Sequence, residues 1–179
     1  MPDEQREPTQ ARVEWELADR FDPEARELAD RHYNRQKVGS PQFVPPGRCL
    51  VLKRRDALWV TSWPFPEYVR HEWPGAWVCS AFRNEGRLLS SDLIRAAVAA
   101  TVWRWPDPPA EGFITFVDRS KTRSKRHPGY CYRAAGWREV GKTKGGLVAL
   151  HLPAEDMPDP LAPLNATLTL EPAIEGGHR

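Results

Sequence analysis

Two apolar runs with a helical segment between them constrain the fold more than any other feature of this 179-residue chain. The runs at 76–82 and 112–118 are short and contain β-branched and aromatic residues, which is typical of buried strands. Between them, apolar residues recur at helical spacing over 93–102, after Ser90 or Ser91, either of which can cap the helix. A strand, a helix and a second strand in this order predict a right-handed parallel crossover.

Segments on both sides of this unit supply further elements. Asp22 followed by Pro23 is typical of the start of a helix. The stretch 48–63 is typical of an antiparallel hairpin, Pro128 can begin another short helix, and 146–152 is typical of a last strand. The pattern therefore predicts an α/β domain.

Charge divides the chain into three parts. Residues 31–152 carry more than twice as many Lys and Arg as Asp and Glu, yet the formal net charge of the chain is only +2 because both ends are acidic. We expect a flexible acidic segment over 1–20, a single α/β domain over 21–152 and a Pro-rich, acidic, flexible tail over 153–179. The basic domain indicates a polyanionic partner, most commonly a phosphate backbone.

The sequence also disfavours several classes of protein. It has no apolar run of roughly 18 residues and no signal-like start, so we expect a soluble, intracellular protein without a membrane partner. Cys49, Cys79 and Cys131 show no C-x-x-C spacing and the five histidines are dispersed, so we predict reduced thiols and no metal site. Motifs of P-loop, G-x-S-x-G and dinucleotide-binding enzymes are missing.

A run of cations follows the second predicted strand. Five basic residues lie in 119–127 without an acidic one. Ligands of open α/β sheets bind at the carboxyl ends of the strands, where this loop would lie. We predict DNA phosphate contacts by Lys121, Arg123, Lys125 and Arg126; a solvated charge run is the alternative.

The order of elements, followed by the Tyr-x-x-x-Gly-Trp pattern of 132–137, resembles the second half of the GNAT acyltransferase fold over roughly 48–152. The resemblance implies a mixed central sheet with flanking helices. Within that superfamily, four short segments resemble the Mom-like DNA-modification proteins of bacteriophages. The segments are 82–86, 90–94, 115–118 and 128–132.

Mom-like proteins convert adenine in phage DNA to an N6-carbamoylmethyl form that resists host restriction enzymes. The resemblance implies a transferase that adds a small carbamoylmethyl or acyl-type group to adenine N6 in DNA, in the cytoplasm of the host bacterium. Two alternatives stay open. One is an acyl-CoA-dependent N-acyltransferase acting on a small amine or a protein, and the other is a non-catalytic nucleic-acid-binding module.

The group donor is left open, because the expected phosphate loop is atypical. Acyl-CoA enzymes of the GNAT fold usually carry an R/Q-x-x-G-x-G/A loop, whose backbone N–H groups hold the pyrophosphate. The segment 83–88 keeps the first glycine but has Leu88 where the second small residue belongs, and Glu85 adds repulsion. Acyl-CoA is therefore one possible donor, and an aminoacyl or other activated donor is another.

Four residues are candidates for the chemistry. Asp118 is expected to accept the N6 proton, and Tyr132 aligns with the general acid of many GNAT enzymes. Ser91 is a candidate for binding a substrate or donor oxygen, and Arg83 for neutralising donor or phosphate charge. Each has a structural alternative: an ion pair of Asp118 with Arg119 or another cation, a packed tyrosine, a helix cap and a surface ion pair.

Substrate recognition is expected around the end of the first helix. His32, Tyr33 and Arg35 lead into a loop containing Gln42, and in GNAT folds this region overhangs the acceptor site. Gln42 has the amide that suits an adenine edge. The alternative is that His32 and Tyr33 serve only packing and the helix dipole.

Overall fold

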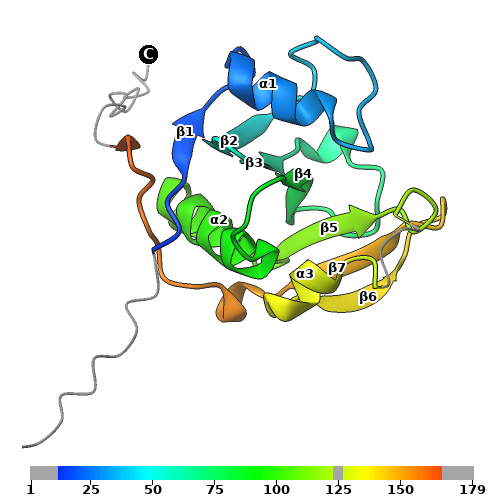
Figure 1. The fold of residues 1–179 in the computed structure, drawn as a ribbon. Coiled ribbons are helices and arrows are strands. Elements are labelled where there is room, and N and C mark those ends of the chain that lie inside the picture. Colours follow the sequence, from blue (N-terminus) through cyan, green and yellow to red (C-terminus); the bar gives the residue numbers. More distant parts are fainter. Residues whose placement is uncertain (1–11, 123–126, 167–179) are drawn as a thin grey trace, which may run out of the picture.

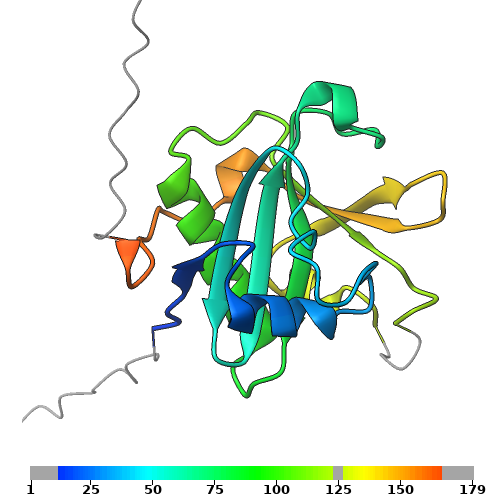
Figure 2. The same ribbon diagram turned by 90° about the horizontal axis from the view of Figure 1, so that it is seen from above.

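The computed structural model describes residues 12–122 and 127–166 and shows one α/β domain (Figures 1 and 2). A seven-stranded sheet has the order β1-β2-β3-β4-β5-β7-β6. Within the described residues β4 and β5 pair in parallel, and all other neighbouring strands are antiparallel. The predicted single domain with a mixed central sheet and flanking helices is confirmed.

The elements have the following bounds. The strands are β1 (Glu16–Ala18), β2 (Arg48–Arg54), β3 (Ala57–Trp63), β4 (Trp77–Asn84), β5 (Phe113–Val117), β6 (Arg138–Lys142) and β7 (Val148–Leu152). The helices are α1 (Pro23–Asp30), α2 (Ser90–Arg104) and α3 (Tyr130–Ala134). Short 3₁₀ turns lie at Pro66–Tyr68 and Ala154–Asp156.

Helices cover both faces of the sheet (Figure 2). The apolar side of α1 packs on β2 and β3, and α2 packs on the opposite face. The core on the α2 side includes the fully buried Trp59, Trp77 and Phe113. The apolar positions of α2 that the helical spacing predicted are all buried: Leu93, Ile94, Ala97, Val98 and Val102.

The parallel pairing of β4 and β5 is short. It ends where Cys79 faces Thr115, although β4 continues to Asn84. In the neighbouring ladder Val60 pairs with Ala81 and Thr61 with Cys79, so Ser80 is an extra residue in β4. Such a bulge bends its strand and disrupts the local ladder. The sheet is therefore unpaired between the carboxyl ends of β4 and β5.

The starts of the helices differ in how they are capped. Asp22 caps α1 as predicted, because its Oδ1 accepts from the Ala25 N–H at 3.0 Å. The predicted serine cap of α2 is wrong: Leu89 holds the N-cap position without a side-chain bond. The Ser90 hydroxyl instead accepts a hydrogen bond of 3.0 Å from the side-chain amide of Asn84, the last residue of β4.

The domain extends beyond the predicted bounds 21–152. Trp15 is buried and donates from Nε1 to the Leu93 carbonyl at 3.1 Å, and β1 pairs with β2. Asn165 accepts from the Leu17 N–H at 2.7 Å and donates to the Leu17 carbonyl at 3.1 Å. Trp15, β1 and Asn165 therefore belong to the folded domain, although the segments that contain them are rich in polar residues.

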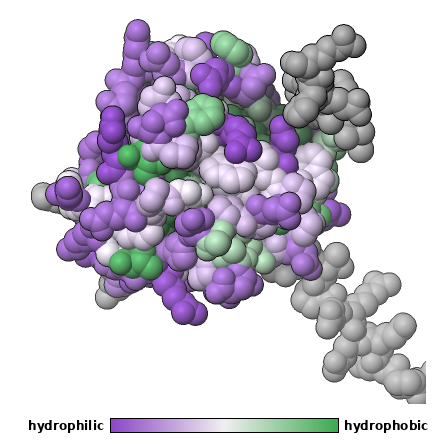
Figure 3. Space-filling view, turned by 180° about the vertical axis from the view of Figure 1, so that it is seen from behind, coloured by the Kyte–Doolittle hydropathy of each residue, from purple (hydrophilic) through white to green (hydrophobic). Residues whose placement is uncertain are grey.

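The face seen in Figure 3 is largely hydrophilic with scattered apolar side chains. Among the helices of the described residues, none has the length and apolar character needed to cross a membrane.

Candidate active site

A cavity of about 340 Å³ opens where β4 and β5 stop pairing. Cys79 and Ser80 of β4 line it, as do Thr115 and Phe116 of β5. Neighbouring residues of a strand point to opposite faces of a sheet, so this cavity passes between the two strands. It lies at the carboxyl ends of the parallel strands, where the sequence predicted the functional edge.

Three polar side chains meet inside this cavity. The Tyr132 hydroxyl of α3 lies 3.5 Å from the Cys79 Sγ, and the Thr115 hydroxyl donates to the Cys79 carbonyl at 3.0 Å. Burial, together with the adjacent thiols, raises the pKa of Tyr132 well above its usual value. Burial raises the pKa of Cys79 to about 12. At neutral pH Tyr132 thus keeps its hydroxyl proton, and Cys79 is a thiol and not a nucleophilic thiolate.

The segment after α1 borders the mouth of the cavity. His32 and Tyr33 both line it, and their rings stack with centroids 4.6 Å apart. The hydroxyl of Tyr33 lies near the backbone of Asp118, which follows β5. Burial raises the pKa of Tyr33, so this hydroxyl also stays protonated at neutral pH. Tyr33 therefore lies between the segment after α1 and the end of β5, at the mouth of the cavity.

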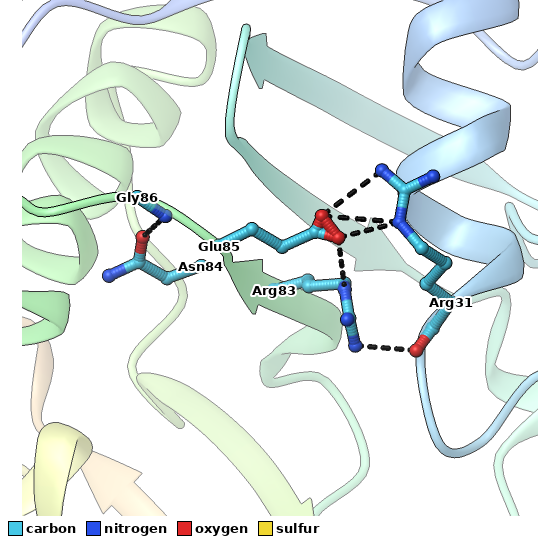
Figure 4. A network of polar contacts seen from close by, with 5 residues as sticks. All are labelled: Arg31, Arg83, Asn84, Glu85 and Gly86. Carbon is cyan, nitrogen blue, oxygen red and sulfur yellow. Dashed lines mark hydrogen bonds and ion pairs between the residues drawn. The ribbon is translucent and has the colours of Figure 1, made fainter.

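Arg83 lines the cavity and also belongs to a polar network at its rim (Figure 4). Its Nε lies 3.0 Å from Glu85 Oε1, and its Nη1 donates to the Arg31 carbonyl. Arg31 binds the same carboxylate through Nε at 2.6 Å and Nη2 at 3.0 Å. These bonds from Arg31 hold the pKa of Glu85 below its usual value. Arg83 therefore forms the ion pair that was its structural alternative, and it also lines the cavity.

Two predicted catalytic residues are not part of the lining. Asp118 Oδ1 accepts from the hydroxyl and the backbone N–H of Ser120 at 2.6 and 2.9 Å. The bond from the Ser120 hydroxyl holds the pKa of Asp118 below its usual value, so the carboxylate is ionised at neutral pH. In addition to the Ser120 bonds, the charge of Lys121 lowers this pKa, whereas Arg119 contacts Glu139. Ser91 is half-buried in the first turn of α2, and its neighbour Ser90 lines the cavity in its place.

The predicted DNA-binding residues are divided by the structure. Arg35 binds Asp30 at 2.7 Å and the Ser40 carbonyl at a short distance, so it stabilises the loop after α1. Gln42 and Lys121 are exposed and lie outside the cavity lining. The remaining three predicted phosphate contacts lie outside the described residues: Arg123, Lys125 and Arg126.

Sequence reasoning missed several lining residues. Cys79 and Thr115 lie in the two apolar runs that predicted buried strands. A small polar residue within each run was the sequence feature that could have indicated a cavity there. Asn84 gave no signal, yet it fixes the loop after β4 by donating to the Leu88 carbonyl at 2.8 Å and accepting from the Gly86 N–H at 2.9 Å. Because these partners follow from the loop conformation, the sequence alone did not reveal them.

The loop after β4 does not fit a pyrophosphate. The Gly86 N–H donates to the Asn84 side chain and is therefore not available to a pyrophosphate. The repulsion expected from Glu85 is offset, because this carboxylate is paired with Arg31 and Arg83. Leu88, which we predicted to block the phosphate, packs against the core, and the exposed Leu89 lies at the helix start. The loop thus lacks the free backbone donors that hold coenzyme A in acyl-CoA enzymes of the GNAT fold.

Potential metal ligands and comparisons with known proteins give no further assignment. Within residues 12–122 and 127–166, no three His, Cys, Asp or Glu side chains are grouped so that they could hold a metal ion. No protein-family model, no curated protein and no solved structure matches the chain. The function is therefore inferred from the cavity and the side chains around it.

Proposed function

We propose that this protein is a transferase that modifies the N6 amine of adenine in DNA, the function that the resemblance to Mom-like proteins implies. The observation that carries the proposal is the buried, protonated Tyr132 inside a cavity between β4 and β5. A group-transfer reaction needs a proton donor for its leaving group, and this hydroxyl has the protonation state for that role.

The acceptor amine sets further demands. The N6 lone pair is delocalised into the adenine ring, so the amine needs close alignment with the donor and an acceptor for its proton. In the proposed step N6 forms a bond to the donor carbon, the bond to the leaving group breaks, and Tyr132 protonates that group. Asp118, which is ionised at the rim, is our candidate for receiving the N6 proton.

The cavity suits a base that has left the duplex. Its volume of about 340 Å³ falls in the range of small-molecule sites. A base must be unstacked before its amine can react inside an enzyme. The stacked His32 and Tyr33 at the mouth offer an aromatic surface for such a base. Modified adenine in phage DNA would resist host restriction enzymes, which is the role we propose.

Nucleoside mass spectrometry on DNA from cells that produce the protein tests the proposal. Wild type should give a mass-shifted deoxyadenosine, and Tyr132→Phe should lower its amount by roughly 10²-fold or more. Tyr130→Phe is the matched control, because Tyr130 lies on the same helix but is exposed and outside the cavity lining.

Unshifted deoxyadenosine in cells that contain folded wild-type protein would contradict the proposal. Equal modification by wild type and Tyr132→Phe would remove Tyr132 from the chemistry. DNA binding without any altered base would favour the non-catalytic binding module.

A further inference from the structure

Two carboxylates near the cavity each bind two arginines. Glu85 binds Arg31 at 2.6 Å and Arg83 at 3.0 Å, and we call these two arginines the β4-side pair. Glu139 of β6 binds Arg133 at 2.5 Å and lies 3.5 Å from Arg119; these arginines form the β5-side pair. The same arrangement of one acid between two guanidinium groups thus occurs twice.

Each pair keeps a surplus of positive charge and of donors. One carboxylate against two guanidinium groups leaves a formal charge of +1. Two guanidinium groups carry about ten N–H donors, whereas a carboxylate has about four acceptor sites. The arginine side chains are also accessible: Arg31 and Arg119 are each 50% exposed, Arg133 is 46% and Arg83 is 31%.

The shared carboxylate also orients the arginines. A free arginine loses side-chain entropy when it binds an anion, and a guanidinium that is already held in place loses less. The Arg83 guanidinium is further fixed because its Nη1 donates to the backbone carbonyl of Arg31 (Figure 4). Planar, oriented guanidinium groups are the preferred protein partners of phosphate oxygens. These pairs therefore have the properties of prepared phosphate contacts.

The two pairs adjoin different segments that line the cavity. In the β4-side pair, Arg83 lines the cavity and Arg31 directly precedes the lining segment 32–34. In the β5-side pair, Arg119 lies two residues beyond β5 and Arg133 follows Tyr132 in α3. A nucleotide whose base enters the cavity leaves its two phosphates outside, one in each direction along the strand.

We propose that the β4-side and β5-side pairs bind phosphates of one DNA strand on the two sides of the cavity, while the base between them enters it. This inference rests on the proposed function, because it takes DNA as the substrate. It adds the residues that hold the strand and the form of substrate, which is a nucleotide within a strand and not a free nucleoside or a small amine.

Salt-dependent binding of a fluorescent single-stranded deoxyoligonucleotide tests the inference. For single strands, each phosphate contact contributes about 0.7 to the slope of log K against log salt. Arg31→Gln and Arg119→Gln should each reduce the slope by about 0.7, and the double variant should reduce it by about twice that amount. Arg104→Gln is the matched control, because α2 places Arg104 roughly 20 Å from the helix start near the cavity; its slope should equal that of wild type.

Unchanged slopes in Arg31→Gln and Arg119→Gln would overturn the inference, as would an equal reduction in Arg104→Gln or a wild type that binds no DNA. Melting curves check folding, and if Arg31→Gln is unstable, Arg119→Gln decides. Nucleoside mass spectrometry is a separate readout. Reduced slopes with unmodified DNA would support these contacts and contradict the proposed chemistry, whereas modified DNA with unchanged slopes would do the reverse.

Discussion

Tyr132 shows how much of one residue's role depends on its surroundings. The pattern of 132–137 marked this tyrosine as a candidate proton donor. Its contact with Cys79, which is 53 positions away in sequence, and the burial that keeps it protonated appear only in the folded protein. Ser91 is the opposite case. The sequence marked it as a candidate, but the preceding residue of α2, Ser90, lines the cavity instead.

Thr61 and Thr101 allow a test of a buried polar chain. The Thr61 hydroxyl accepts from Trp59 Nε1 at 2.7 Å and lies 2.9 Å from the Thr101 hydroxyl, and all three residues are fully buried. Thr61→Val leaves the Trp59 N–H without this partner and should lower the free energy of unfolding by about 1–3 kcal/mol. Thr101→Val keeps the Trp59 bond but removes the acceptor of the buried Thr61 hydroxyl, because the Thr101 hydroxyl itself donates to the Ala97 carbonyl at 2.8 Å; it should also cost about 1–3 kcal/mol. Urea unfolding measures both, and an unchanged free energy of unfolding in either variant would refute the explanation.

At the scale of elements, spacing predicted the β4-α2-β5 crossover but not the opening between its strands. Apolar periodicity is a local property, so it was visible in the sequence. The opening depends on the extra residue Ser80, which is defined only by how β4 pairs with β3. For the same reason the sequence indicated the edge of the sheet at which the cavity lies, without revealing which side chains share the cavity.

The start of β5 depends on a glycine. Gly112 has φ of +74°, and a Cβ there would lie 2.4 Å from the Leu152 carbonyl oxygen of β7. Gly136 has φ of +94° but no atom within 4 Å of such a Cβ. Gly136→Ala should therefore cost about 1–2 kcal/mol from the left-handed backbone alone, and Gly112→Ala should cost more because β5 and β7 must also move apart. Thermal unfolding compares the variants, and equal losses would count against this account.

At the scale of the whole molecule, paired carboxylates predict loss of stability in acid. The Arg31 bond lowers the pKa of Glu85 and the Ser120 bond lowers that of Asp118. Burial alone would raise the pKa of Asp22, but bonds from Lys53 and the Ala25 N–H outweigh it and lower the pKa. Each folded-state pKa lies below the unfolded value of about 4, so this stability is present above pH 4 and is lost as pH falls through the folded values.

Melting temperatures between pH 7 and pH 3 test this prediction. They should stay level down to about pH 5 and then fall, and Glu85→Gln should show a smaller fall than wild type because it has no proton to take up at that position. A melting temperature that is constant to pH 3 would show that these carboxylates do not stabilise the fold.

The sequence by itself determined the crossover strands, the apolar side of α2, the Asp22 cap and the basic character of the domain. Each of these depends on neighbouring residues or on composition. Only the tertiary structure decided the bulge at Ser80, the contact of Tyr132 with Cys79 and the arginine pairs. It also decided that Asn165 holds Leu17 at the sheet edge, 148 positions away in sequence. Such contacts form between segments that packing brings together, so no local pattern in the chain encodes them.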